Sequence, residues 1–136
     1  MGLTILDAGV VIALLERRDV HHHAASTAIA SARDRGDRMI LPASTYAEIL
    51  VNPSRSGPQA VAAVDGFVDE LPIEVVPVDR AIAASAAALR ARHGRGLRLP
   101  DGLVLGTAQV LRADRVMSTD AGLNGRGVEV ELVRGT

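Results

Sequence analysis

The strongest structural signal in the sequence is LTILDAGVVIALL at residues 3–15. Its first four residues predict a short buried strand. The apolar run from Ala8 to Leu15 predicts a buried helix, which the charged residues after Leu15 bring to an end. Asp7 separates the two elements. A buried strand that leads directly into a buried helix is typical of an α/β fold.

The same alternation of strand and helix signals continues along the chain. We expect helices at residues 19–33, 45–51, 59–70, 79–94 and 100–111, strands at 39–41, 73–76, 116–117 and 128–133, and a loop at 52–58. Asp19 should cap the first of these helices. Because strands and helices alternate throughout, the sheet should be mostly parallel and covered by helices. No repeat or linker interrupts the pattern, so residues 1–136 are expected to form one domain.

The composition narrows the classes of function. The chain has 136 residues, 48% of them hydrophobic, and a formal net charge of −1, which does not indicate a strongly basic nucleic-acid binder. The absence of cysteine excludes disulfides and thiolate metal sites and suits a cytoplasmic protein. No stretch approaches the ~20 apolar residues of a membrane span, and Asp7 interrupts the N-terminal apolar run. We therefore expect neither a signal peptide nor a membrane segment.

Four acidic residues stand where a predicted strand ends or a predicted helix begins: Asp7, Glu48, Asp101 and Asp120. In an open parallel sheet these places gather at the carboxyl edge, where ligands bind. Carboxylates that converge repel one another unless a cation lies among them, and Mg²⁺ or Mn²⁺ prefers oxygen ligands. The pattern therefore predicts a divalent-cation site built from these acids.

Each acid also has an ordinary structural explanation. Asp7 is suited to cap the helix that follows it. Thr45 and Glu48 match the Thr-x-x-Glu capping box. Asp101 is favoured by the dipole at a helix N-terminus, and Asp120 is a common turn former. Residue by residue the two interpretations stay open, and the joint placement of the acids is the stronger argument for a site.

The order and spacing of these acids resemble the PIN domain family, in particular the VapC toxins of toxin–antitoxin pairs. The matching pieces cover the whole chain: LDAGVVIA at residues 6–13, the strand end at Pro42 followed by YAEI at 46–49, LPDGLV at 99–104 and VMSTD at 116–120. The resemblance implies a three-layer α/β/α fold and a Mg²⁺- or Mn²⁺-dependent endoribonuclease. It implies that the four acids hold the metal and that Ser118 supports the site.

The resemblance also implies partners. A VapC-type toxin has a cognate VapB-type antitoxin and an RNA substrate, and it forms homodimers. Two apolar segments are candidate docking surfaces for the antitoxin, although either is equally compatible with the core. They are residues 82–89 and the helix around Tyr46, Ile49 and Leu50.

The chain departs from the family pattern in two places. Gly9 stands where many relatives carry Ser or Thr two residues after the first Asp, and no aromatic residue follows Asp120. Gly9 removes one possible hydroxyl support for Asp7. We therefore expect metal affinity or activity to be lower than is usual for the family.

The expected chemistry is hydrolysis of a phosphodiester by a metal-activated water. A bound cation lowers the pKa of that water and neutralises charge on the leaving oxygen. Four arginines just before Asp101 are candidate RNA phosphate ligands: Arg90, Arg92, Arg95 and Arg98. The alternative is that Arg90 and Arg92 only complement the dipole at a helix C-terminus.

Two further interpretations remain. A non-catalytic Mg²⁺-binding module, either receiver-like or an antitoxin-binding regulator, would use the same acidic pocket, but a receiver needs a lysine and this chain has none. Three consecutive histidines, residues 21–23, suggest a metal site, yet successive helical residues point about 100° apart and cannot share one ion. We expect them to form a solvated helical turn.

Overall fold

The computed structural model describes residues 2–135, and its sheet is built around the segment that opens the chain. β1 (Leu3–Leu6) is the central strand, and α1 (Ala8–Leu15) follows it directly after Asp7. Five strands pair in the order β3-β2-β1-β4-β5, and every pairing is parallel. The other strands are β2 (Arg38–Pro42), β3 (Ile73–Val76), β4 (Arg115–Ser118) and β5 (Val130–Leu132). The predicted parallel sheet is confirmed.

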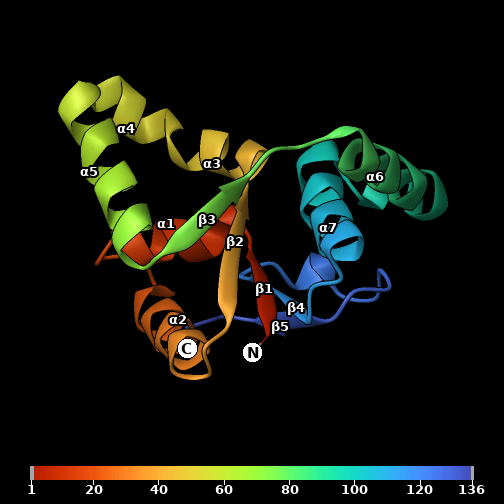
Figure 1. Cartoon of the computed structure of the whole chain (residues 1–136), viewed down its shortest axis with the longest axis horizontal. Helices are drawn as coiled ribbons and strands as arrows, with labels where there is room; N and C mark the ends of the chain where they lie inside the picture. Colours follow the sequence, from red (N-terminus) through yellow and green to blue (C-terminus); the bar gives the residue numbers. More distant parts are fainter. Residues whose placement is uncertain (1, 136) are drawn as a thin grey trace.

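Helices cover both faces of this sheet. The remaining helices are α2 (His22–Asp34), α3 (Ala43–Ile49), α4 (Val51–Ser56), α5 (Pro58–Glu70), α6 (Arg80–His93) and α7 (Leu99–Leu111), with short 3₁₀ turns at η1 (Gly94–Gly96) and η2 (Ala121–Leu123). Figure 1 shows α1, α2 and α5 to one side of the strands and α6 and α7 to the other. The fold is therefore a three-layer α/β/α arrangement. No helix within residues 2–135 is long and apolar enough to cross a membrane.

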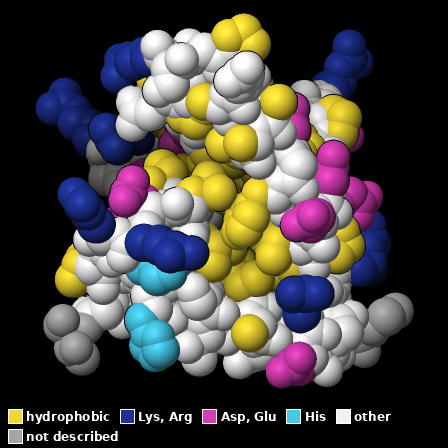
Figure 2. Space-filling model, turned by 90° about the vertical axis from the view of Figure 1, so that its left-hand side faces the viewer, with side chains coloured by type: hydrophobic (Ala, Val, Ile, Leu, Met, Phe, Trp, Pro, Cys, Tyr) yellow, Lys and Arg dark blue, Asp and Glu magenta, His cyan; other side chains and the backbone are white. Residues whose placement is uncertain are grey.

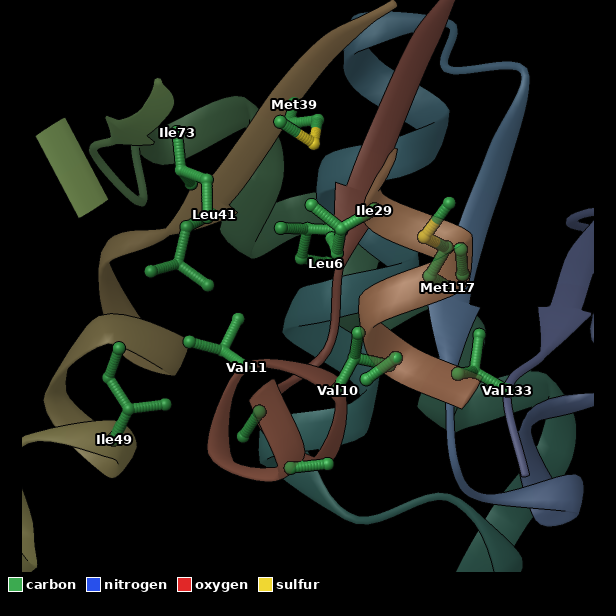
Figure 3. Packing of buried hydrophobic residues seen from close by; sticks show 14 of the residues in the cluster. Leu6, Val10, Val11, Ile29, Met39, Leu41, Ile49, Ile73, Met117 and Val133 are labelled. Carbon is green, nitrogen blue, oxygen red and sulfur yellow. The ribbon is translucent and has the colours of Figure 1, made fainter. Parts of the chain in front are cut away.

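One half of the core lies between the sheet and the helices α1 and α2. Leu6, Leu41 and Met117 point from three adjacent strands toward Val10 and Val11 of α1 (Figure 3). All five side chains are fully buried. The α2 helix meets this layer through Ile29 and three buried alanines, residues 25, 28 and 32. This packing fixes α1, and with it the position of Asp7, over the carboxyl end of β1.

The second half of the core lies between the sheet and α7, and α6 packs outside α7. Gly106 permits the close approach of these two helices, because a Cβ atom there would lie 3.0 Å from backbone atoms of both Ile82 and Ala86. Ile82, Ala86 and Leu89 are buried in this contact. These three side chains of the segment 82–89 therefore belong to the core, while its other alanines, at 83, 84, 87 and 88, are exposed.

The second docking candidate is also largely used inside the molecule. Ile49 is buried, and the Tyr46 hydroxyl donates a hydrogen bond to Asp65 of α5. Leu50 is partly buried and packs against the core cluster that contains Ile49. This helix therefore joins α5 to the core and leaves little of its apolar surface free.

The loop predicted at residues 52–58 is instead largely helical. α4 covers Val51–Ser56 and includes Pro53 in its first turn. A proline there costs no helical hydrogen bond, because the first N–H groups of a helix have no partner within it. Gly57, at a φ of +124°, then separates α4 from α5. The two helices form a hairpin that projects beside α3 (Figure 1).

The start of α2 also differs from the prediction. The helix begins at His22, and Asp19 accepts a hydrogen bond from the backbone N–H of His21 at 2.8 Å instead of capping the helix. His22 Nδ1 lies 2.8 Å from the carbonyl oxygen of Ala13, and His21 Nδ1 accepts from the N–H of Gly135 at 2.9 Å. Two of the three histidines are therefore structural contacts and not a solvated turn.

Candidate functional site

The four predicted acids lie at or near the carboxyl edge of the sheet. Asp7 joins β1 to α1, and Asp120 follows β4, the parallel neighbour of β1. Glu48 is carried by α3, which begins where β2 ends, and Asp101 lies in the first turn of α7. Because β1, β2 and β4 are adjacent and parallel, the chain segments that follow them leave the sheet at the same edge.

Asp7 is held on three sides. Its backbone N–H donates to the carbonyl oxygen of Met117 at 3.0 Å. Its Oδ1 accepts from the N–H of Ala8 at 2.9 Å, and its Oδ2 accepts from the hydroxyl of Ser118 at 2.7 Å. Asp7 does cap α1, as its position in the sequence predicted. The second oxygen, however, is engaged by β4 and not by the helix.

Ser118 links two of the acids. Its side chain is fully buried, donates to Asp7 and accepts from the backbone N–H of Asp120 at 2.9 Å. Asp120 Oδ1 in turn accepts from the N–H of Gly122 at 2.8 Å, so Asp120 also forms a turn. The orientation of Asp7 and the start of the turn that carries Asp120 therefore depend on one hydroxyl.

The capping-box explanation of Glu48 is wrong. α3 begins at Ala43 with Pro42 at its N-cap, so Thr45 is already inside the helix. The Thr45 hydroxyl is buried and has no hydrogen-bond partner within residues 2–135. Glu48 is exposed, and its pKa is raised by desolvation of the carboxyl and by the charges of Asp7 and Asp101. Its surroundings are therefore other carboxylates.

Neighbouring acids raise the pKa of three of these carboxyls, those of Asp7, Glu48 and Asp101. Burial raises the pKa of Asp7, against the hydrogen bonds from Ser118 and Ala8, and the charge of Asp120 raises it further. Burial also raises the pKa of Asp101, with additional repulsion from Asp7 and Asp120. Carboxylates that raise one another's pKa are those that a nearby cation would relieve.

Arg98 supplies some positive charge near Glu48 and Asp101. It precedes α7, and its charge lowers the pKa of both Glu48 and Asp101, although burial and the other acids outweigh it. Arg90 has a different role, because its Nε donates to the carbonyl oxygen of Leu97 at 3.1 Å and its stem lies against Gly102. Arg92 and Arg95 are exposed.

The acidic site has the chemistry of a metal site without a preformed cage. Its donors are carboxylate oxygens with a supporting hydroxyl, which suits a hard divalent cation. Among residues 2–135, however, no three histidine, aspartate or glutamate side chains lie close enough together to hold an ion as they stand. A cation would therefore have to draw the carboxylates together or bind some of them through water.

An apolar groove opens beside Glu48 and was not predicted from the sequence. It has a volume of about 380 Å³ and lies between α1, α5 and the α3–α4 segment. Figure 2, which views the side of the molecule where α1, α2 and α5 lie, shows hydrophobic side chains gathered in a hollow there. Ile12 of α1 lines the groove and is 42% exposed, and Glu16 and Glu48 add negative charge to it.

Carboxylate oxygens at the carboxyl edge of a parallel α/β/α fold are ligands of the kind that hard cations prefer. The sequence model of the PIN domain matches residues 4–127, and the chain therefore belongs to the PIN domain family. Among curated proteins, no sequence matches it significantly.

Solved structures with the same fold include proteins of toxin–antitoxin systems. A toxin–antitoxin complex from Klebsiella pneumoniae superposes with a TM-score of 0.79 at 19% identity, covering 98% of this chain and 99% of that one. VapC20 from Mycobacterium tuberculosis, a toxin that cleaves the sarcin–ricin loop, gives 0.77 at 18% identity, covering 96% and 98%. DNA-bound VapBC from Salmonella typhimurium gives 0.73 at 21%, covering 96% and 98%. The chain has the fold of the VapC toxins.

Proposed function

We propose that the protein is a Mg²⁺- or Mn²⁺-dependent endoribonuclease that acts as the toxin of a toxin–antitoxin pair. The observation that carries this proposal is the placement of four carboxylates at or near one edge of the sheet, where the buried Ser118 bonds both Asp7 and the turn of Asp120. Membership of the PIN domain family supports a nuclease, and the VapC-like fold supports a toxin.

In this proposal Asp7, Glu48, Asp101 and Asp120 hold the metal. When bound, such a cation lowers the pKa of a water molecule and neutralises charge on the phosphate. Asp7 is the fixed member, because both of its oxygens already accept hydrogen bonds. Glu48 and Asp120 are exposed, so in this proposal they are the acids most open to water and to the substrate.

Arg98 is the basic residue best placed to bind an RNA phosphate at this site. Its charge reaches Glu48 and Asp101, and a guanidinium offers paired donors to phosphate oxygens. Arg95 is exposed three residues earlier and extends the positive surface. Arg90 is assigned to the fold, because its guanidinium is engaged with the backbone at Leu97.

The proposed partners are a VapB-type antitoxin and a second copy of the chain. The groove beside Glu48 suits an antitoxin helix with an apolar face, because the exposed Ile12 and the partly buried Leu15 line it. Glu16 and Glu48 add negative charge, so basic residues on that helix would complement the groove. An antitoxin seated there would lie directly beside the acidic site.

The test is cleavage of a cellular RNA pool by the purified protein with Mg²⁺, with EDTA, and with the Asp101→Asn variant. Asp34→Asn is the matched control, because Asp34 is exposed at the end of α2. We expect cleavage that needs the metal, is lost in Asp101→Asn and is kept in Asp34→Asn. Mg²⁺ binding without cleavage of any RNA would favour the non-catalytic binding module, and unchanged cleavage by Asp101→Asn would refute the assignment of the acids.

A further inference from the structure

Gly9 and Thr119 share one small space at the acidic site. Gly9 lies in the first turn of α1, two residues after Asp7, and Thr119 lies between Ser118 and Asp120. Thr119 Oγ1 occupies the place that a Cβ atom on Gly9 would take. The Cβ and Cγ2 atoms of Thr119 lie 3.4 and 3.5 Å from that position. A side chain at residue 9 and the present position of the Thr119 side chain therefore exclude each other.

The backbone around Thr119 is held in place, so a side chain at residue 9 would require the Thr119 side chain to rotate. The carbonyl oxygen of Thr119 accepts a hydrogen bond from Arg134 Nε at 2.8 Å. On either side, the Ser118 hydroxyl is bonded to Asp7, and the N–H of Asp120 is bonded to Ser118. With its neighbours fixed, Thr119 can relieve a clash only by rotating its side chain, and its Cβ at 3.4 Å would then be in ordinary van der Waals contact with residue 9.

We infer that Thr119 is a positioning residue of the acidic site, whose side chain takes the place of the one that Gly9 lacks. It sets the spacing between the first turn of α1, which follows Asp7, and the turn that carries Asp120. It also brings a hydroxyl to the side of α1 where residue 9 supplies none. This inference rests on the proposed function.

The test transfers the hydroxyl between the two positions. The variants are Thr119→Ala, Thr119→Ser, Gly9→Ala and the double variant Gly9→Ser/Thr119→Ala. Gly66→Ala and Thr27→Ala are matched controls, because Gly66 has no atom within 4 Å of an added Cβ and Thr27 is exposed on α2. Mn²⁺ binding to the protein without RNA is measured by electron paramagnetic resonance, next to Mg²⁺-dependent RNA cleavage and the melting temperature.

Groups that orient metal ligands typically change metal affinity by about 10–100-fold when they are removed. We therefore expect Thr119→Ala and Gly9→Ala each to weaken Mn²⁺ binding by about tenfold. Thr119→Ser and the double variant should stay within about threefold of the native chain, because each keeps one hydroxyl in the shared space. Both controls should bind Mn²⁺ as the native chain does.

Native Mn²⁺ affinity in Thr119→Ala would overturn the inference. The inference would also be overturned if the double variant bound Mn²⁺ more weakly than either single variant. Losses in affinity that simply add would mean that residues 9 and 119 do not share one space. If Gly9→Ala does not fold, the Mn²⁺ affinities of Thr119→Ala, Thr119→Ser and the double variant still test the inference. A native chain that neither binds Mn²⁺ nor cleaves RNA would refute the proposed function itself, and the inference would fall with it.

Discussion

Ser118→Ala removes the hydroxyl that joins Asp7 to the turn carrying Asp120. The Ser118 side chain is fully buried and makes two hydrogen bonds, at 2.7 Å to the Asp7 carboxylate and at 2.9 Å from the Asp120 N–H. The variant leaves both groups without this partner and adds no new contact. The loss is therefore mainly electrostatic.

The expected cost follows from these two bonds. A hydrogen bond to a charged group contributes about 1.5–3 kcal/mol, and Asp120 is exposed enough for water to replace part of the second bond. We expect Ser118→Ala to lower the free energy of unfolding by about 2–3 kcal/mol. For a chain of 136 residues this corresponds to a fall in Tm of roughly 7–10 °C.

The cost should also depend on pH. Burial raises the pKa of Asp7 in the folded protein, and the Ser118 hydrogen bond opposes that rise, so the variant raises this pKa further. A carboxyl whose folded pKa lies above its unfolded value opposes folding at neutral pH. This unfavourable contribution to stability decreases as pH falls through the folded pKa, and it disappears below the unfolded pKa. The destabilisation should therefore be larger at pH 7 than at pH 4.

Urea unfolding at pH 7 and at pH 4 measures both effects. Ser85→Ala is the control, because the Ser85 hydroxyl donates to Gln109 at 2.9 Å at an exposed position and should cost less than about 0.5 kcal/mol. The reasoning is refuted if Ser118→Ala costs no more than Ser85→Ala. It is also refuted if the cost of Ser118→Ala is larger at pH 4 than at pH 7.

Three further changes test the fold and the substrate surface. Gly106→Ala should destabilise the protein by about 1 kcal/mol, because the new Cβ would lie 3.0 Å from the backbone of α6. Gly66→Ala, where the Cβ enters open space, should instead stabilise the protein by up to about 1 kcal/mol. The urea midpoints of the two variants measure both effects. Burial raises the pKa of Asp37, but hydrogen bonds from Arg35 and from the backbone, together with nearby arginine charges, outweigh it and lower that pKa. The stability that this carboxylate contributes is therefore present above its unfolded pKa and is lost as pH falls through the folded pKa. Asp37→Asn should make stability depend less on pH in this acid range, and an unchanged slope would contradict this. Arg95→Ala combined with Arg98→Ala should weaken RNA binding and reduce its salt dependence, and an unaltered salt slope would argue against phosphate contact.

The fold was predictable because its signals are local. The central strand is a short apolar run, and α-helices connect β1 to β2, β2 to β3 and β3 to β4, which favours parallel pairing. The error at α4 has a local cause as well. Asn52, Pro53 and Gly57 are strong turn signals, but a proline in the first turn of a helix breaks no helical hydrogen bond.

The acids were found by position, while their surroundings depend on tertiary packing. The end of β2 at Pro42 decides where α3 begins, and this leaves Thr45 inside the helix and removes the capping box. Nothing in the spacing distinguishes Arg90, which is engaged with the fold, from Arg98, which reaches the acids. The groove and the contact between Gly9 and Thr119 join segments that are far apart in the chain, so no local pattern predicts them.

The bond between Asp7 and Ser118 spans 111 positions of the chain, and this separation sets an order in time. β1 emerges from the ribosome early, but its neighbour β4 is synthesised long after it. A nascent chain that ends before β4 carries Asp7, Glu48 and Asp101 without the serine that orients the first of them. All four acids can therefore come together with Ser118 only after translation has passed Asp120.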